Sequence, residues 1–138
     1  MKLSVLVLCF VFLPFKMTAQ GSVLLENLLD SSTLNLQDTL LYGTKSIEFL
    51  KVIEDSRCPK DRNCFWSGKA TALVRIYENG THKEDKELVF GADHIQPYAP
   101  AKLCAIDQKI LYVYDLYPYP SSTGTSRKSL YYLQFVVK

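Results

Sequence analysis

Residues 69–81 read KATALVRIYENGT, and this stretch has the clearest period-two pattern in the chain. Apolar residues stand at every second position, at Ala70, Ala72, Val74 and Ile76. Such alternation is typical of a half-buried β-strand. Asn79 and Gly80 both tolerate a positive φ, so they predict a tight turn with a return strand within residues 83–90. The stretch therefore predicts an antiparallel hairpin.

Similar patterns recur on both sides of this hairpin. Further segments of strand-like composition are residues 33–36, 39–42, 46–53, 109–116 and 130–137, and loop-like segments are residues 54–63, 91–102 and 121–129. The apolar face shifts near Leu50 and Lys51 and again before Leu116, as it does at a β-bulge. Short strands without a long helical pattern predict an all-β fold, a single antiparallel β-sandwich or barrel of about six to eight strands.

Residues 1–19 have the layout of a secretory signal peptide, which would leave residues 20–138 as a single β domain. A positive start at Lys2 precedes an apolar run that is shorter than the ~20 residues needed to span a bilayer. Cleavage after Ala19 fits this layout. Cleavage after Gly21 is the alternative, because Ala19 and Gly21 are then the small residues at the two recognition positions. The alternative is an uncleaved N-terminal helix. We expect an exported protein, periplasmic or secreted, with no transmembrane segment in the mature chain.

The charge balance argues against two classes of partner. The whole chain has 16 Lys and Arg against 14 Asp and Glu. Residues 1–19 remove Lys2 and Lys16 and no acidic residue, so the remaining domain has a formal net charge of zero. A neutral domain lacks the basic surplus that draws proteins to nucleic acid or to anionic membranes. We therefore expect neither partner.

Three cysteines remain after cleavage, Cys58, Cys64 and Cys104. An exported protein meets an oxidising compartment, where thiols tend to pair. The sequence allows three pairs, and we predict Cys58 with Cys64 because this pair closes the shortest loop. Such a disulfide contributes only ~2–2.5 kcal/mol on the chain-entropy model, so it shapes a loop more than it stabilises the fold. Cys104 is then an inert buried residue or, alternatively, a reactive or intermolecularly bonded thiol.

The disulfide loop lies within residues 54–68, EDSRCPKDRNCFWSG, the most distinctive stretch of the chain. A loop closed by a disulfide loses little entropy when it binds, so this one is a candidate binding surface. The charged side chains that would line that surface are Arg57, Lys60, Asp61 and Arg62.

The same loop also has a structural interpretation, which we favour. Asp55 and Arg57 are close enough in sequence to brace the loop through charge-assisted hydrogen bonds. Trp66, the single Trp, stands just before the strand that begins at residue 69. In the structural interpretation the loop directs the side chain of Trp66 into the core.

No pattern indicates catalysis or metal binding, so we expect a protein that is not an enzyme and has neither metal nor cofactor. His82 and His94 lack the spacing of metal ligands, and Cys58 and Cys64 are too far apart for a redox Cys-x-x-Cys motif. Cys104 with His94 is the single Cys–His candidate for a nucleophilic pair. An enzyme with a site assembled in space stays an alternative.

Tyrosines gather toward the C-terminus, at Tyr112, Tyr114, Tyr117, Tyr119, Tyr131 and Tyr132. If they were exposed they would form a binding platform for sugars, peptides or bases. Tyr in a strand is more often half-buried with its hydroxyl in water, and we favour this interpretation.

Two blocks of sequence carry a resemblance to a known family. One is the motif DSRCPxxxxCxWxG of residues 55–68, and the other is LYPYP of residues 116–120, followed by a loop and a Tyr-bearing final strand. Together they resemble an uncharacterised family of small exported proteins of Bacteroidetes-type bacteria. The resemblance implies bacterial export and a small β domain. It brings no activity, so no functional residue is carried over, and Cys104 lies outside the pattern.

These observations predict a non-catalytic binding module for a protein or a cell-envelope component. Inhibition of an exported protease is a special case, with the Cys58–Cys64 loop as the contact. The alternatives are a structural envelope protein without a specific ligand and a hydrolase. The sequence does not indicate an oligomeric state.

Overall fold

The computed structural model describes residues 32–123 and 130–138, so the predicted signal peptide, residues 1–19, lies outside the described residues. The described part is all β, with two sheets of four antiparallel strands. The strands are β1 (Ser32–Asn35), β2 (Thr39–Tyr42), β3 (Lys45–Asp55), β4 (Lys69–Glu78), β5 (Thr81–Gly91), β6 (Ala101–Ile106), β7 (Lys109–Tyr117) and β8 (Tyr132–Val137).

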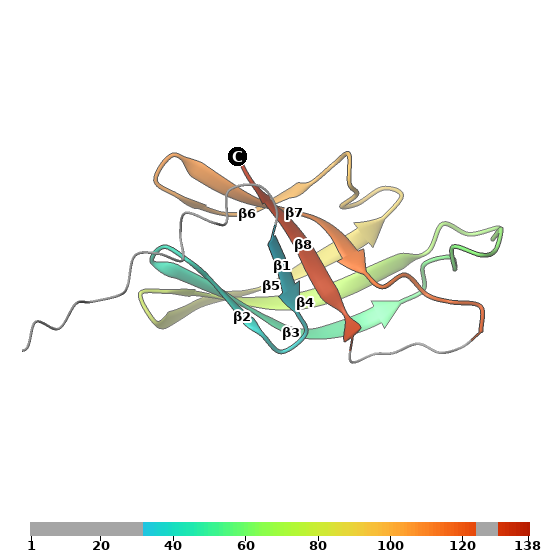
Figure 1. Ribbon diagram of the computed structural model, residues 1–138, viewed down its shortest axis with the longest axis horizontal. Coiled ribbons are helices and arrows are strands. Elements are labelled where there is room, and N and C mark those ends of the chain that lie inside the picture. Colours follow the sequence, from blue (N-terminus) through green and yellow to red (C-terminus); the bar gives the residue numbers. More distant parts are fainter. Residues whose placement is uncertain (1–31, 124–129) are drawn as a thin grey trace, which may run out of the picture.

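The two sheets form the layers of a β-sandwich, so the predicted fold class is confirmed (Figure 1). One sheet has the order β1-β8-β7-β6 and the other the order β2-β3-β4-β5. The predicted hairpin is β4 with β5, in which Glu78 pairs with Thr81 across the turn. Asn79 and Gly80 in this turn have φ values of 51° and 77°, which is the conformation their residue types favour.

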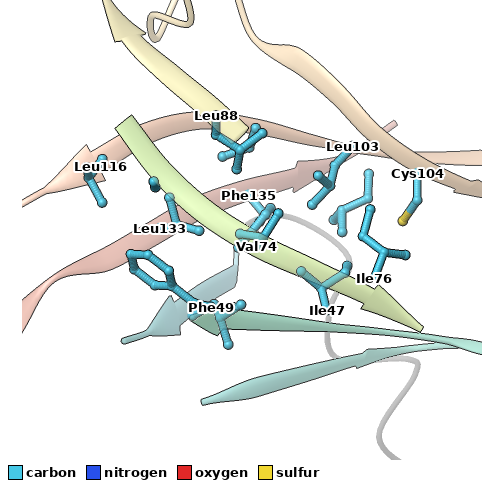
Figure 2. Close-up of a cluster of buried hydrophobic side chains, with 14 of the residues drawn as sticks. Ile47, Phe49, Val74, Ile76, Leu88, Leu103, Cys104, Leu116, Leu133 and Phe135 are labelled. Carbon is cyan, nitrogen blue, oxygen red and sulfur yellow. The ribbon is translucent and has the colours of Figure 1, made fainter. Parts of the chain in front are cut away.

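The core lies between the sheets, and both sheets supply its largest side chains (Figure 2). Phe49, Val74 and Leu88 come from β3, β4 and β5, and Leu133 and Phe135 come from β8. Each of these side chains is almost completely buried. Burial of a side chain of this size stabilises the fold by about 1.5–3 kcal/mol, so this layer is the main source of stability.

Bulges interrupt both layers at the positions where the apolar face was expected to shift. The register of β3 against β4 shifts between Phe49 and Lys51, and that of β7 against β8 shifts between Val113 and Asp115. A bulge adds one residue to a strand and breaks its in–out alternation. As a result Asp115 and Leu116 are adjacent in sequence and both buried, with 4% and 0% of their surfaces exposed.

The strand β6 was not predicted, since residues 91–102 were expected to form a loop and residues 103–108 were not assigned. Ala101–Ile106 pairs with β7, and the register shifts between Lys102 and Cys104. This irregularity buries Leu103 and Cys104 in succession. A strand without alternation has no period-two signal, which is why the sequence pattern missed it.

Candidate functional site

The loop between β3 and β4, residues 56–68, projects from one end of the sandwich, where Figure 1 shows it in green. Cys58 and Cys64 in this loop form a disulfide, with 5.9 Å between their Cα atoms, so the predicted pairing is confirmed. Cys104 is a free thiol in the core. Burial raises the pKa of Cys104, which fits its interpretation as an inert residue.

Arg57 lies at the buried base of the loop. Its Nε and one of its Nη atoms donate to the two carboxylate oxygens of Asp55, at 2.9 and 2.8 Å. The guanidinium also donates to the carbonyl oxygens of Leu116, at 2.6 Å, and Pro118, at 3.1 Å. The predicted brace between Asp55 and Arg57 is therefore confirmed. Arg57 does not present its charge on the exposed surface of the loop as predicted, because only 6% of the residue is exposed and its donors serve the fold.

The ion pair of Arg57 and Asp55 fastens the two sheets together at this end. Burial by itself would lower the pKa of Arg57, but the hydrogen bonds and charge of Asp55 outweigh it and the pKa is raised. The Asp55 side chain is 7% exposed and also accepts a hydrogen bond from the Tyr131 hydroxyl, at 3.0 Å. Asp55 ends β3, whereas Tyr131 precedes β8 of the opposite sheet. A buried pair is stable only when such further bonds satisfy it.

Tyr119 connects this ion pair to a second buried carboxylate. The Cζ atom of Arg57 lies 4.2 Å from the centroid of the Tyr119 ring. The Tyr119 hydroxyl donates to Oδ1 of Asp115 at 3.0 Å, and the backbone N–H of Leu116 donates to the same oxygen at 2.9 Å. Burial and the charge of Asp115 raise the pKa of Tyr119 to about 12, so its hydroxyl stays a donor at neutral pH.

The exposed charges of the loop have separate roles. Nζ of Lys60 lies 4.2 Å from the centroid of the Tyr119 ring, a cation–π contact. Asp61 accepts hydrogen bonds from the hydroxyl of Ser122 and, at 3.3 Å, from its backbone N–H, and these bonds lower the pKa of Asp61. Lys60 and Asp61 thus attach the loop to the segment that follows β7. Arg62 is exposed.

The prediction that Trp66 enters the core is wrong. Its side chain is 59% exposed, and its indole Nε1 donates to the carbonyl oxygen of Ser56 at 3.2 Å. The strand β4 begins at Lys69, and Gly68 before it has a φ of 63°, in the left-handed region. The in–out alternation of β4 therefore does not extend back to Trp66, which instead lies across the outside of the loop.

Phe65 is the residue of this loop that sequence reasoning missed. It is fully exposed, at 107%, and it stands between the disulfide cysteine Cys64 and Trp66. The available signal was the presence of two adjacent aromatic residues beside a disulfide cysteine, of which the sequence analysis considered only Trp66. Two neighbouring aromatic side chains consequently face solvent on one loop.

A pocket of about 210 Å³ lies beside the loop, between the chain that follows β5 and the end of β7. Arg57, Asp115 and Tyr119 supply polar groups to its wall, and Phe90 and Ile95 supply apolar surface. The predicted bulge in β7 was the available signal for Asp115, because a bulge can turn a charged residue of a strand inward.

The other candidate residues do not form a site. His94 is exposed in the loop after β5, whereas Cys104 is in the core, so the proposed Cys–His pair is not assembled. His82 is exposed, and its Nε2 lies 3.0 Å from a carboxylate oxygen of Asp85. Within residues 32–123 and 130–138, no group of three or more His, Cys, Asp or Glu side chains could hold a metal ion.

The tyrosines near the C-terminus are buried or half-buried, as we favoured from the sequence. Tyr117 and Tyr132 stack with 5.6 Å between ring centroids. Lys60 of the disulfide loop lies over the ring of Tyr117, so these tyrosines pack against the loop and do not form an exposed platform.

The described part of the chain contains no helix with the length and apolar character of a membrane span. Comparison of the chain with protein-family models, with curated proteins and with solved structures found no match.

Proposed function

We propose that this chain is an exported, non-catalytic binding module that contacts a protein at or outside the cell envelope through Phe65 and Trp66. The observation that carries the proposal is the exposure of both side chains, 107% and 59%, on a loop held by a disulfide and a buried ion pair. The exposed apolar surface of these two side chains does not stabilise the isolated domain.

The energetics of aromatic side chains favour a protein partner. Burying a Phe stabilises an assembly by about 1.5–3 kcal/mol, and Phe65 obtains none of this within its own chain. Trp is among the residues that most often dominate the binding energy of protein interfaces. An envelope protein whose loop served stability alone would gain nothing from the fully exposed Phe65, so the arrangement favours binding over the purely structural alternative.

The loop is also prepared for binding before a partner arrives. The Cys58–Cys64 disulfide, the Arg57–Asp55 pair and the bond from Ser122 to Asp61 restrict it at three points. A restricted loop loses less conformational entropy on association. Arg62 is then a charge at the rim, where it would affect the association rate more than the affinity.

The expected location agrees with the chemistry of the loop. A disulfide is compatible with an oxidising, extracytoplasmic compartment. The resemblance of the loop motif to small exported bacterial proteins supports the same location. An inhibitor of an exported protease would be a special case of the proposed function, with the loop lying across the enzyme.

Capture of a partner with matched variants tests the proposal. The oxidised protein, its Phe65→Ser/Trp66→Ser variant and a Leu41→Ser control are used to capture proteins from an envelope extract of the source organism. Leu41 is 65% exposed on β2, so its change alters exposed apolar surface away from the loop. We expect the native protein and the control to retain the same partner and the loop variant to lose it.

Two outcomes would contradict the proposal. Equal capture by all three proteins would remove the aromatic pair from the interface. Retention of no specific partner by the native protein would favour the structural alternative. Since all substituted residues are exposed, we expect the three proteins to unfold at similar temperatures, which a thermal melt verifies.

A further inference from the structure

We propose that the pocket beside the disulfide loop receives the side chain of a lysine from the protein partner, with the carboxylate of Asp115 as its counter-ion. This inference rests on the proposed function, because it specifies the chemistry of the partner at the same end of the sandwich. It is carried by a buried carboxylate that lines a pocket and takes part in none of the ion pairs among the described residues.

Oδ1 of Asp115 accepts the hydrogen bonds from the backbone N–H of Leu116 and from the hydroxyl of Tyr119. The residue is 4% exposed, and its carboxylate also interacts with the side chain of Tyr117. Asp115 lines the pocket, and none of the ion pairs among the described residues includes it. A buried carboxylate without a cation is unfavourable, so a bound cation would be stabilised here.

The nearby guanidinium of Arg57 is shared by two carboxylates, because Asp55 and, less strongly, Asp115 raise its pKa against the effect of burial. Two of its nitrogens are paired with Asp55, and the guanidinium also serves the carbonyls of Leu116 and Pro118. Two carboxylates, those of Asp55 and Asp115, therefore face one guanidinium, which leaves an excess of negative charge beside the pocket.

The size and walls of the pocket fit an alkylammonium group. Its volume of about 210 Å³ is below the roughly 300–1,000 Å³ of pockets for larger ligands, so it suits a single side chain. Phe90, Ile95 and Pro97 offer apolar surface for a methylene stem. One available oxygen suits the point charge of an ammonium, whereas a guanidinium prefers two oxygens side by side.

The pocket is adjacent to the exposed aromatic residues. Ser67 in its wall directly follows Trp66, and Pro97 directly precedes Tyr98, which is 82% exposed. A partner that covers Trp66 is thus in reach of the pocket. A lysine of that partner would place its stem against Ile95 and its ammonium at Asp115.

Titration with a lysine derivative tests the inference. The oxidised, ¹⁵N-labelled protein is titrated with Nα-acetyl-lysine methylamide and, as a matched control, with Nα-acetyl-norleucine methylamide, which lacks the ammonium. Amide shifts of Gly91, Ala92 and Leu116 report on the pocket. We expect saturable shifts with the lysine derivative, none with the norleucine derivative, and about tenfold weaker binding to Asp115→Asn.

A second variant keeps the test decisive if Asp115→Asn does not fold. Ala92 is exposed and lines the pocket, so Ala92→Leu narrows the pocket while leaving Asp115 in place, and we expect it to weaken binding as well. Absence of saturable shifts in the native protein, or equal shifts with both derivatives, would overturn the inference.

The two proposals fail separately. Phe65→Ser/Trp66→Ser is expected to bind the lysine derivative normally while losing the partner. If the native protein captures a partner but Asp115→Asn captures it equally well, the proposed function stands and the lysine inference is overturned. If no partner is captured but the lysine derivative binds, the pocket is a site for free amines, and both proposals fail as stated.

Discussion

Arg57 and Arg62 belong to the same loop, yet their surroundings give them opposite roles. Arg57 is buried and bonded to Asp55 and to the carbonyl oxygens of Leu116 in β7 and Pro118 just after it, whereas Arg62 is exposed. Loop position placed both arginines on a candidate binding surface, although the short spacing of Asp55 and Arg57 also predicted the brace between them. The contacts of Arg57 with Leu116 and Pro118, which are distant in sequence, follow from the three-dimensional fold.

The first prediction concerns this pair of arginines. We expect Arg57→Ala to lower the free energy of unfolding by about 3–5 kcal/mol, because it leaves the Asp55 carboxylate buried without a cation. The matched control Arg62→Ala should change it by less than about 0.5 kcal/mol. Urea unfolding of the oxidised proteins measures both values. A small effect of both substitutions would show that the buried pair does not hold this end of the sandwich.

The second prediction concerns the ionisation of Tyr119. Burial and the charge of Asp115 raise the pKa of Tyr119 from 10.0 to about 12. Because the folded-state pKa lies above the unfolded value, this residue contributes stability that is fully present below pH 10 and is lost as the pH rises to about 12. Tyr119→Phe should therefore flatten the alkaline decline of the urea midpoint. Identical declines in both proteins would contradict the assignment.

At the scale of the elements, a glycine fixes the junction between the disulfide loop and β4. Gly68 has a φ of 63°, and a Cβ atom there would lie 2.1 Å from the carbonyl oxygen of Ser56. Both the backbone conformation and the close approach of two chain segments therefore require glycine. The same conformation directs Trp66 away from the core.

The third prediction follows from this junction. We expect Gly68→Ala to destabilise the protein by more than about 2 kcal/mol, because it adds a backbone clash to the strain of a left-handed alanine. Gly80→Ala is the matched control, with a φ of 77° and nothing within 4 Å of the new Cβ, and it should cost about 1 kcal/mol. Denaturant unfolding compares the two. Equal losses would show that the approach of Ser56 has no energetic consequence.

Bulges mark the limit of what the strand patterns could predict. The shifts of apolar face near Leu50 and before Leu116 were visible in the sequence, and both correspond to bulges. The pattern did not show that the bulge in β7 buries the charged Asp115. It also missed β6, where two buried residues in succession leave no alternation. Side-chain periodicity predicts regular strands, whereas Asp115 in the pocket wall belongs to a strand with a bulge.

At the scale of the whole molecule, most of the architecture followed from the sequence. Period-two segments and the Asn79-Gly80 turn were sufficient to predict an antiparallel β-sandwich or barrel, because each strand has one buried face, and the structure decides for the sandwich. The short spacing of Cys58 and Cys64 was sufficient to predict the disulfide, which the structure confirms. The pocket was not predictable, because its wall combines Arg57, Phe90 and Asp115 from three separate regions of the chain.

The fourth prediction tests the packing of the whole core through Cys104. This free thiol is 7% exposed, and its pKa is raised by burial, so alkylation requires unfolding. We expect iodoacetamide to modify Cys104 at least about a hundredfold faster in concentrated urea than in the native protein. Mass spectrometry of the intact protein measures the rates. Rapid modification of the native protein would show that this side of the core opens readily.

The connections of Arg57 also determine when the loop acquires its shape during synthesis. Its carbonyl partners lie 59 and 61 residues further along the chain. A nascent polypeptide that extends only as far as β6 contains both loop cysteines but neither of these carbonyl acceptors. The Arg57 side chain can therefore complete its hydrogen bonds only after β7 and Pro118 have been synthesised.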